Sequence, residues 1–346
     1  MKRKVERLSC SGSATSAVLR EALVPYVVRS LSALFQSFTG KIPRNALVDE
    51  AIMSSFCQLD DEIKNDGAAA LQDAKTLTEA LSRLAPSYAG SCAILSMFDP
   101  NTKLLRVAST GDCRAVLVHR DPESGKYIAT ALSEDQTGKN ESELARITAE
   151  HPGEEGVVNL SNGRTFGLAP SRAFGDMNYK WPLEVIKECR AKFFGPRPLN
   201  EYRDFPEYKT PPYITAKPVV TTTEIRGKGN VLVMASDGFW DHISTDQSGE
   251  LIGMWITARE SGDIGKGPRK PFPIPTKAKG ITDDEDRMKN ENFVVEDDNV
   301  ATHLVRNAFG GKDIERLCGV VGAQPPLARR VRDDITVKVV FFGDDE

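Results

Sequence analysis

The segment VLVMASDGFWD, residues 231–241, carries the clearest structural signal in this chain. Its apolar start, residues 231–235, predicts a buried strand. Gly238 interrupts the run, so we expect Asp237 at the C-terminal end of the strand and Asp241 about one helical turn beyond. Two ionised carboxylates near an apolar core need a compensating charge, so they predict a cation site. The alternative is a plain Asp-Gly turn in which Asp241 caps the next helix.

Three more stretches of the sequence support the prediction of a cation site at residues 237–241. Asp112 follows a strand-like run in ASTGDCRAVLV, and Asp333 and Asp334 precede the last strand-like run in RDDITVKVVFF. The segment SRAFGD, residues 171–176, lies between them along the chain.

Six blocks of this sequence, in order, are similar to those of the metal-dependent protein phosphatase family (PPM, type 2C). The family patterns are G-[ST]-x-A, A-N-x-G-D-S-R, L-[ST]-x-D-H, S-R-A-[FL]-G-D, A-[ST]-D-G-[LFV]-W-D and R-D-N-[IM]-[ST]. The matching blocks of this chain are GSCA (90–93), ASTGDCRA (108–115), LSEDQ (132–136), SRAFGD (171–176), ASDGFWD (235–241) and RDDIT (332–336). Six blocks in the right order make the resemblance specific, and it spans about residue 11 to the C-terminus.

The spacing of apolar residues predicts the order of helices and strands. Recurrence every three or four residues predicts helices over 19–34, 44–64, 71–84, 141–150, 245–259 and 298–311. Strands are expected at 91–98, 103–109, 114–119, 127–132, 218–226, 230–235 and 336–342. We expect the first four strands to pair in sequence as one antiparallel meander. This order of elements predicts an α+β layered fold.

The family resemblance implies a more specific fold, a four-layer α/β/β/α sandwich of two antiparallel sheets flanked by helices, with metals in a cleft at one end. It implies one phosphatase domain over 11–346 that lacks the family's first strands, and residues 1–10 are expected to be a disordered or truncated N-terminus. Residues 177–215 and 261–297 have the composition of insertions. The second is dense in Gly, Pro, Lys and acids, so we expect disorder or a flexible lid.

The overall composition narrows the class of protein and of metal. The 346 residues are 40% hydrophobic and 27% charged, which is ordinary for a globular protein. The net charge of -4 and the lack of a basic stripe give no reason to expect nucleic acid, and no apolar run approaches the ~20 residues of a membrane span. The six cysteines form no CxxC, and the four histidines lack ligand spacing. Oxygen ligands for Mg²⁺ or Mn²⁺ therefore fit better than a His and Cys site.

The resemblance assigns metal ligands to four aspartates. Asp237 and Asp333 match two residues that hold one metal of a catalytic pair, and Asp112 and Asp241, with Asp237, match the ligands of a possible third, weaker metal. Two divalent ions about 3.5–4 Å apart can activate a water and neutralise a phosphoryl group.

Three further residues are expected to support the site. Asp334 stands where most relatives carry Asn, and we expect it to orient the site. Arg172 and Asp176 are expected to pin the loop after SRAFG, with a catalytic role as the alternative.

The sequence departs from the family at its N-terminal blocks. The pattern D-G-H-x-G, whose Asp bridges both metals and whose His is the general acid, does not occur, and LSCSG (8–12) stands in its place, with Leu8 at the Asp and Cys10 at the His. The phosphate-binding Arg is also missing, so no catalytic residue is assigned. Two explanations remain: an N-terminal truncation of an active phosphatase, which we favour, or a pseudophosphatase that binds partners without catalysis.

Three features resemble the pyruvate dehydrogenase phosphatase branch of the family, namely TPPYITAKPVV (210–220), the insertion that precedes it, and DNVATHLVRNAFGG (298–311). The branch implies a phosphoserine substrate on a mitochondrial dehydrogenase complex. It also implies a mitochondrial location, with the cytoplasm as the alternative.

Overall fold

The computed structural model describes residues 4–10, 13–39, 42–193, 208–265, 288–324 and 327–343. The chain forms two compact units. The first comprises residues 1–98, 106–113 and 134–222, and the second comprises residues 99–105, 114–133 and 223–346. Among the described residues, no helix has the length and apolar character that a membrane crossing requires.

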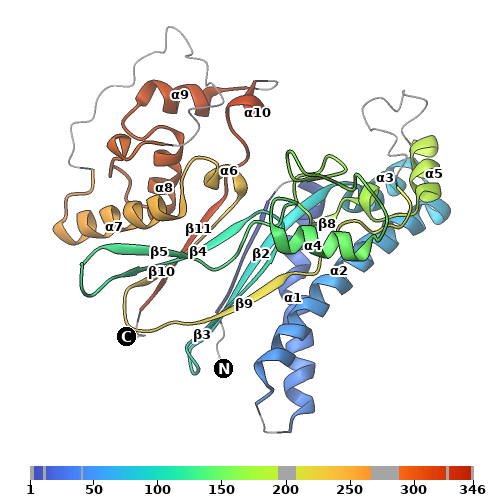
Figure 1. Cartoon of the computed structure of the whole chain (residues 1–346), viewed down its shortest axis with the longest axis horizontal. Coiled ribbons are helices and arrows are strands. Elements are labelled where there is room, and N and C mark those ends of the chain that lie inside the picture. The colour runs from blue at the N-terminus through green and yellow to red at the C-terminus, as the bar shows by residue number, and fades with distance from the viewer. Residues whose placement is uncertain are drawn as a thin grey trace. The chain divides into compact units, whose positions relative to one another are not determined.

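The first unit is built on a five-stranded sheet with the order β1-β2-β3-β9, in which β8 also pairs with β2 (Figure 1). β1 and β8 both run antiparallel to β2. The strands are β1 (Lys4–Cys10), β2 (Gly90–Asp99), β3 (Leu104–Thr110), β6 (Val158–Asn159), β7 (Arg164–Thr165), β8 (Phe174–Gly175) and β9 (Val219–Glu224). The helices are α1 (Ser13–Ser37), α2 (Asn45–Asp73), α3 (Leu77–Tyr88), α4 (Glu141–Glu150), η1 (Met177–Tyr179) and α5 (Leu183–Phe193).

Helices α1 and α2 cover this sheet with the apolar stripes that the sequence predicts. Leu19 and Leu23 of α1 and Ile52 and Phe56 of α2 are fully buried in one core cluster with Leu95 of β2. Each buried side chain of this size contributes about 1.5–3 kcal/mol relative to exposure. The stripes are therefore packing faces, as their spacing predicts.

Helix α2 continues past the predicted helix end at residue 64 and runs to Asp73, with Gly67 in its last turns. A Cβ at Gly67 would lie 1.8 Å from Ser87 Oγ on α3, so glycine permits a close approach of the two helices. Ser87 Oγ donates to Ile63 O at 3.1 Å across the same contact. Gly67 thus lies within α2 at a close contact with α3.

The second unit is built on a four-stranded sheet with the order β11-β10-β4-β5 (Figure 1). All three pairings are antiparallel. The strands are β4 (Arg114–Arg120), β5 (Tyr127–Ala131), β10 (Asn230–Ala235) and β11 (Val337–Phe342). The helices are α6 (Asp237–Trp240), α7 (Thr245–Ser261), η3 (Asn290–Asn292), α8 (Val300–Phe309), α9 (Ile314–Gly322) and α10 (Ala328–Val331).

Helices α7 and α8 pack on this sheet through a core of their own. Val231 and Val233 of β10 are fully buried and share a cluster with Leu251 of α7 and Leu304 of α8. The predicted α+β class, with two antiparallel sheets flanked by helices, is therefore confirmed.

The prediction that the first four strands form a single meander is wrong, although all four strands are present. β2 and β3 lie in the first sheet, and β4 and β5 lie in the second. Residues 111–113 therefore link two different sheets instead of closing a hairpin. Within this link Gly111 has φ +104°, and a Cβ there would lie 2.3 Å from Cys92 Sγ of β2, so the path of the link depends on a residue that is distant in sequence.

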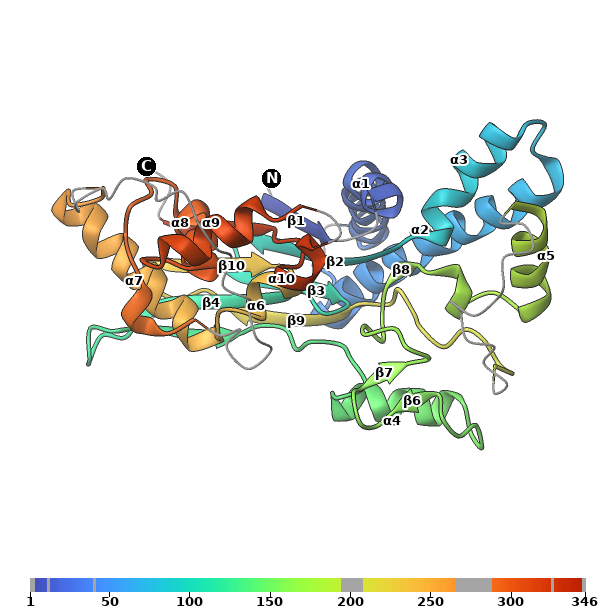
Figure 2. The same cartoon turned by 90° about the horizontal axis from the view of Figure 1, so that it is seen from above.

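Two stretches for which disorder was one of the expected alternatives contain ordered residues, while a truncated N-terminus and a flexible lid stay predictions. Lys4–Cys10 is strand β1, paired with β2 from Lys4↔Phe98 to Cys10↔Cys92. At the end of the 261–297 segment, Met288 and Phe293 are 4% and 2% exposed and belong to the core of the second unit. Residues 266–287 lie outside the described residues. Within 177–215, α5 lies beside α2 (Figure 2), and Gln72 Nε2 donates to Glu188 of α5 at 2.8 Å.

Candidate active site

Ser236 joins the end of β10 to the segment before β11. Its main-chain N–H donates to Thr336 O at 3.1 Å, its hydroxyl donates to Asp334 O at 2.9 Å, and the same hydroxyl accepts from Thr336 N–H at 2.9 Å. Ser236 is only 1% exposed, and buried polar groups of this kind need partners. These bonds fix residues 334–336 beside the residue that precedes Asp237.

Gly238 allows the segment of residues 333–334 to approach the start of α6. A Cβ at Gly238 would lie 2.8 Å from Asp334 O and 3.0 Å from Asp333 Cβ, so any larger residue would push this segment away. Asp237 precedes this glycine as the first residue of α6, and its Oδ1 accepts from Gly238 N–H at 3.0 Å. Two of the predicted metal ligands therefore lie on adjacent segments of the second unit.

Asp333 is held by two donors in the structure. Its Oδ1 accepts from Asp334 N–H at 2.7 Å and also contacts the guanidinium of Arg329 on α10. The Asp333 side chain is 23% exposed and that of Arg329 is 75% exposed. A cation of the protein itself thus neutralises this carboxylate. The side chain of Asp334 is exposed, and its main chain takes part through the bonds to Ser236 and Asp333.

Asp241 is exposed and ends α6, where its N–H donates to Asp237 O at 2.8 Å. It does not cap the next helix, which was the alternative to the cation site. Ser244 caps α7 instead, because its hydroxyl accepts from Gln247 N–H at 3.1 Å.

Asp112 lies in the first unit, in the turn after β3. Cys92 Sγ donates to its Oδ1 at 3.1 Å. Burial raises the pKa of Asp112, and the hydrogen bond from Cys92 lowers it in part. A nearby positive charge would stabilise the ionised form of a carboxylate in such surroundings.

The four predicted metal ligands are thus divided between the units: Asp112 belongs to the first, and Asp237, Asp241 and Asp333 belong to the second. Their gathering into one cluster stays a prediction. In the part of the chain that the structure describes, no group of three or more His, Cys, Asp or Glu side chains can hold a metal ion. The neighbouring pair Asp237 and Asp333 fits Mg²⁺ or Mn²⁺ in the kind of donor, since both ions prefer oxygen, but two carboxylates do not complete a ligand set.

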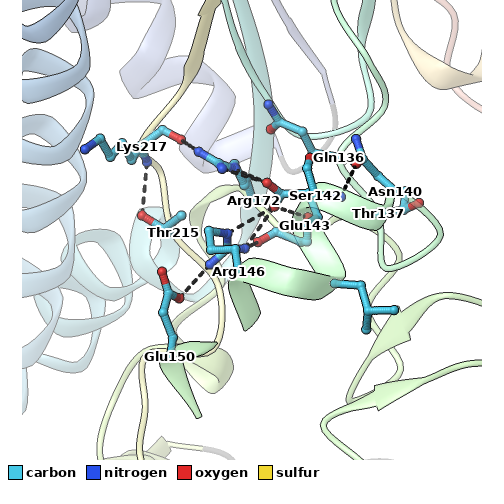
Figure 3. A network of polar contacts seen from close by, with 12 residues as sticks. Gln136, Thr137, Asn140, Ser142, Glu143, Arg146, Glu150, Arg172, Thr215 and Lys217 are labelled. Carbon is cyan, nitrogen blue, oxygen red and sulfur yellow. Dashed lines mark hydrogen bonds and ion pairs between the residues drawn. The ribbon is translucent and has the colours of Figure 1, made fainter. Parts of the chain in front are cut away.

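Glu143 of α4 is the centre of a buried polar network (Figure 3). Its Oε1 accepts from Arg172 Nε at 2.9 Å and Nη2 at 2.6 Å, and its Oε2 accepts from Arg146 Nη2 at 2.9 Å and Ser171 Oγ at 2.6 Å. Arg172 Nη1 also donates to Lys217 O at 2.6 Å. Burial alone would raise the pKa of Glu143, but these donors lower it to about 2. The predicted supporting residue Arg172 therefore ties the SRAFGD segment to α4 and to the chain before β9.

Asp176 lies in a tight pocket of the same segment. It adopts φ +52°, and a Cβ at Gly90 would lie 1.8 Å from its Oδ2. Next to it, Asp60 binds Lys180 Nζ at 2.6 Å and Gly175 N–H at 2.8 Å. Burial raises the pKa of Asp176 to about 6, Lys180 lowers it, and Asp60 raises it.

Sequence reasoning missed Gln136, Glu143 and Arg146 as parts of this region. Gln136 ends the LSEDQ block, where the similar family block ends in His. Glu143 and Arg146 stand three residues apart on one helix, which is an ion-pair spacing. These were the signals in the sequence, but neither shows that the groups are buried.

Comparison with known sequences links the chain to one family. The sequence model of the family described as Protein phosphatase 2C matches residues 24–266. A protein phosphatase 2C homolog of Schizosaccharomyces pombe is 38% identical over 343 residues, which cover 96% of this chain and 72% of that protein.

Mitochondrial pyruvate dehydrogenase phosphatase 1 from two species is also similar to this chain. The Saccharomyces cerevisiae protein is 35% identical and the alignment covers 96% of this chain, and the Rattus norvegicus protein is 35% identical over 86% of it. The chain spans 60% and 55% of the length of these two relatives. A crystal structure of a serine-threonine phosphatase 2C from Toxoplasma gondii matches 98% of this chain and 84% of its own, with a TM-score of 0.52 and 17% identity, which supports the fold.

Proposed function

Because this chain belongs to the protein phosphatase 2C family, we propose that it hydrolyses phosphoserine and phosphothreonine in proteins with the help of Mg²⁺ or Mn²⁺. The observation that carries the proposal is the family match over residues 24–266, together with relatives at 35–38% identity. Asp237 and Asp333, which lie on adjacent segments, carry carboxylates of the kind that this chemistry needs.

In this proposal Asp237 and Asp333 hold a divalent ion, and Asp112 and Asp241 contribute to a third ion. Bound ions would supply an acidified water and positive charge for the phosphoryl oxygens. The other residues prepare the site: Ser236 aligns the segment after Asp333 with the end of β10, and Gly238 leaves the space that this alignment needs.

The substrate that we propose is a phosphoserine on a mitochondrial dehydrogenase complex. The support is the similarity of this chain to the mitochondrial pyruvate dehydrogenase phosphatases of Saccharomyces cerevisiae and Rattus norvegicus. The same names support a mitochondrial location. The insertions that contain α5 and η3 are the segments we propose to recognise this partner.

A direct test measures phosphate release from a phosphoserine peptide as Mn²⁺ is added. The wild-type chain should show metal-dependent release that is at least ~10²-fold slower than that of a variant with a restored D-G-H-x-G block, and Asp237→Asn should lower the release further in both chains, since loss of one electrostatic or acid–base element costs about 10²-fold or more. Asp298→Asn, an exposed carboxylate of the same unit, is the control and should keep wild-type activity. Equal rates for wild type and Asp237→Asn would exclude this site.

A second candidate function is a phosphatase-like binding module. Two observations favour it: the D-G-H-x-G block does not occur in the sequence, and the described residues contain no group of three metal ligands. It predicts no Mn²⁺-dependent release, but capture of the dehydrogenase complex in a pull-down. Adding a strand with D-G-H-x-G ahead of α1 separates the candidates, because recovered turnover would favour the phosphatase.

A further inference from the structure

Residues 208–213 are joined to the end of α4 by a small polar cluster, which we call the clasp and which comprises His151, Glu154, Thr210 and Tyr213. All four residues belong to the first unit. His151 follows the last turn of α4 and is only 4% exposed, and its ring stacks on that of Tyr213 with centroids 4.3 Å apart. Tyr213 is itself fully buried. A buried histidine thus lies where two segments that are distant in sequence meet.

The hydrogen bonds of the clasp fix the positions of its protons. Thr210 Oγ1 donates to Glu154 Oε1, and the Tyr213 hydroxyl donates to Glu154 Oε2 at 2.6 Å. Burial alone would raise the pKa of Glu154, but these two donors lower it from its ordinary value of 4.5. Because the one proton of the Thr210 hydroxyl is directed to Glu154, the 2.8 Å contact between His151 Nδ1 and Thr210 Oγ1 requires a proton on Nδ1. His151 is therefore either the neutral Nδ1–H tautomer or the cation.

The second ring nitrogen distinguishes these two forms. His151 Nε2 is buried and has no hydrogen-bond partner among the described residues. In the cation, Nε2–H would be a buried, charged donor without a hydrogen bond, whereas the neutral form leaves only an unused acceptor. Burial accordingly lowers the pKa of His151. Smaller effects come from groups that face the ring, of which only Arg146 also lowers this pKa: Glu154, Glu150, Arg146 and the main chain of Pro212.

The other end of the same segment is held by groups that do not titrate near neutral pH. Ala173 N–H donates to Thr215 O at 3.0 Å, and Arg172 Nη1 donates to Lys217 O at 2.6 Å. The segment therefore has one attachment that depends on the protonation of His151 and one that does not.

We propose that the clasp is an acid-sensitive switch: protonation of His151 releases residues 208–213 from the end of α4, while residues 215–217 stay attached to the SRAFGD segment. The proposal goes beyond the proposed function, because it involves neither a metal ion nor a phosphate. Since the pKa of His151 in the fold lies below its ordinary value of 6.5, the closed clasp is fully stable above about pH 6.5 and loses stability as the pH falls towards the lowered pKa.

The readout must be local, because Asp176 of the same unit titrates in the same range. Its pKa is raised to about 6, so its protonation stabilises the fold as the pH falls, which is the opposite sign. The experiment therefore measures amide hydrogen exchange at about pH 8 and about pH 5, corrected for the intrinsic pH dependence of exchange. The amides of Lys209 and Thr210, which donate to the Tyr213 hydroxyl at 2.6 and 2.9 Å, report the clasp, and that of Ala173 reports the other attachment.

In the wild type, the protection of the Lys209 and Thr210 amides should fall about fivefold or more from pH 8 to pH 5, since an unpaired buried donor typically shifts an equilibrium by this factor. The protection of the Ala173 amide should change by less than about twofold. An equal loss at Ala173 would mean that the whole unit opens, and would overturn the proposal of a local switch.

The main variant is His151→Asn, because the asparagine amide can donate to Thr210 in place of Nδ1 but does not titrate. It should keep the clasp closed at both pH values, and Thr210→Val, which removes the acceptor, should open it already at pH 8. The matched control is His119→Asn, a half-buried histidine of the second unit, which should keep the pH dependence of the wild type. The same pH dependence in His151→Asn as in the wild type would contradict the role of the imidazole.

A further measurement needs no variant, so it decides the question even if the substituted chains fold poorly. The ring ¹⁵N chemical shifts of His151 in the wild type should show the neutral Nδ1–H tautomer at pH 8, and the cation should appear together with the loss of protection at Lys209 and Thr210. A proton on Nε2 at pH 8, or a clasp that stays protected after His151 is protonated, would overturn the proposal. None of these outcomes bears on phosphate release, which tests the proposed function separately.

Discussion

At the scale of single residues, Glu143 is a buried carboxylate whose charge is stabilised by several hydrogen-bond donors. Its carboxylate accepts from Arg172, Arg146 and Ser171, and its side chain is 2% exposed. Glu143→Gln removes the charge and leaves Arg172 without its ionic partner. Breaking a buried pair in this way costs about 3–5 kcal/mol, and urea unfolding at pH 7 should show a loss of this size.

The pH dependence of this loss follows from the pKa of Glu143, which is about 2 and so lies below its ordinary value of 4.5. A lowered pKa gives stability that is present above pH 4.5 and is lost as the pH falls towards 2. The difference between wild type and Glu143→Gln should therefore be greatest above pH 4.5 and shrink below it. A difference that does not change with pH would contradict the role of the charge.

Asp176 predicts the opposite dependence, because its pKa is raised to about 6 from 3.8. The proton on a buried carboxyl stabilises the fold, so the wild type gains stability as the pH falls from about 6 towards 3.8 and loses it above 6. Asp176→Asn removes the cost of the ionised form and suits φ +52°, which Asn tolerates. It should be up to about 3 kcal/mol more stable than wild type at pH 8 and lose this advantage by pH 4. Thermal unfolding across this range tests it.

The ion pair between Arg329 and Asp333 predicts that Arg329 competes with a metal ion for the Asp333 carboxylate. The two side chains form an ion pair at a site where Arg329 is 75% exposed, and such surface pairs contribute about 0–1 kcal/mol. Arg329→Gln should therefore tighten Mn²⁺ binding by at most about fivefold, measured by calorimetry. Arg226→Gln is the control, because Arg226 is 82% exposed and pairs with Glu224 in the same unit. Weaker Mn²⁺ binding in Arg329→Gln would show that the arginine supports the site instead.

At the scale of helices, two glycines make a matched pair. Gly67 of α2 faces Ser87 of α3, and a Cβ would also lie 2.8 Å from Ser87 Cβ, whereas a Cβ at Gly319 of α9 meets nothing within 4 Å. Gly67→Ala should destabilise by about 1–3 kcal/mol through overpacking. Gly319→Ala should stabilise by about 0.5–1 kcal/mol, since alanine loses less entropy in a helix. Chemical unfolding measures both, and a stabilised Gly67→Ala would show that the two helices can separate freely.

Element boundaries could be predicted well where the sequence pattern is local. The observed bounds agree with the predicted ones to within one residue for β4, β10 and α4, and the predicted apolar stripe lies within α1. The assignment of strands to sheets could not be predicted in the same way. β3 and β4 follow one another like a hairpin, but residues 111–113 between them depend on Cys92 and Gln136, which lie elsewhere in the chain.

At the scale of the whole molecule, we expect the activity to depend on metal ions and the stability of the fold to be independent of them. Each unit has its own apolar core, and no group of three metal ligands occurs in the described part of the chain. Removing divalent ions with EDTA should therefore abolish phosphate release while the midpoint of thermal unfolding falls by less than about 2 °C, which for a chain of this size is under ~1.5 kcal/mol. Added Mn²⁺ should restore release. A large drop in the midpoint would reveal a structural metal.

The candidate site could be predicted from sequence in its residue types but not in its arrangement. Asp237 and Asp333 were identified from short blocks, because a block preserves the side chain and its immediate neighbours. The contacts that place them depend on residues far apart in the sequence. Ser236 bonds to Thr336 over a separation of 100 residues, and Gln136 bonds to Gly111 over 25.

The sequence alone therefore determined the α+β class, the order of most helices and strands, and the family to which the chain belongs. These properties are encoded in periodicity and in blocks a few residues long. Only the tertiary structure decided that α2 passes through Gly67, that the chain changes sheets at Gly111, and that Gln136 and Glu143 support the turn of Asp112 and the SRAFGD loop. Each of these depends on burial and on a partner from another element, and the physical demand that every buried polar group be paired acts only after the chain has folded.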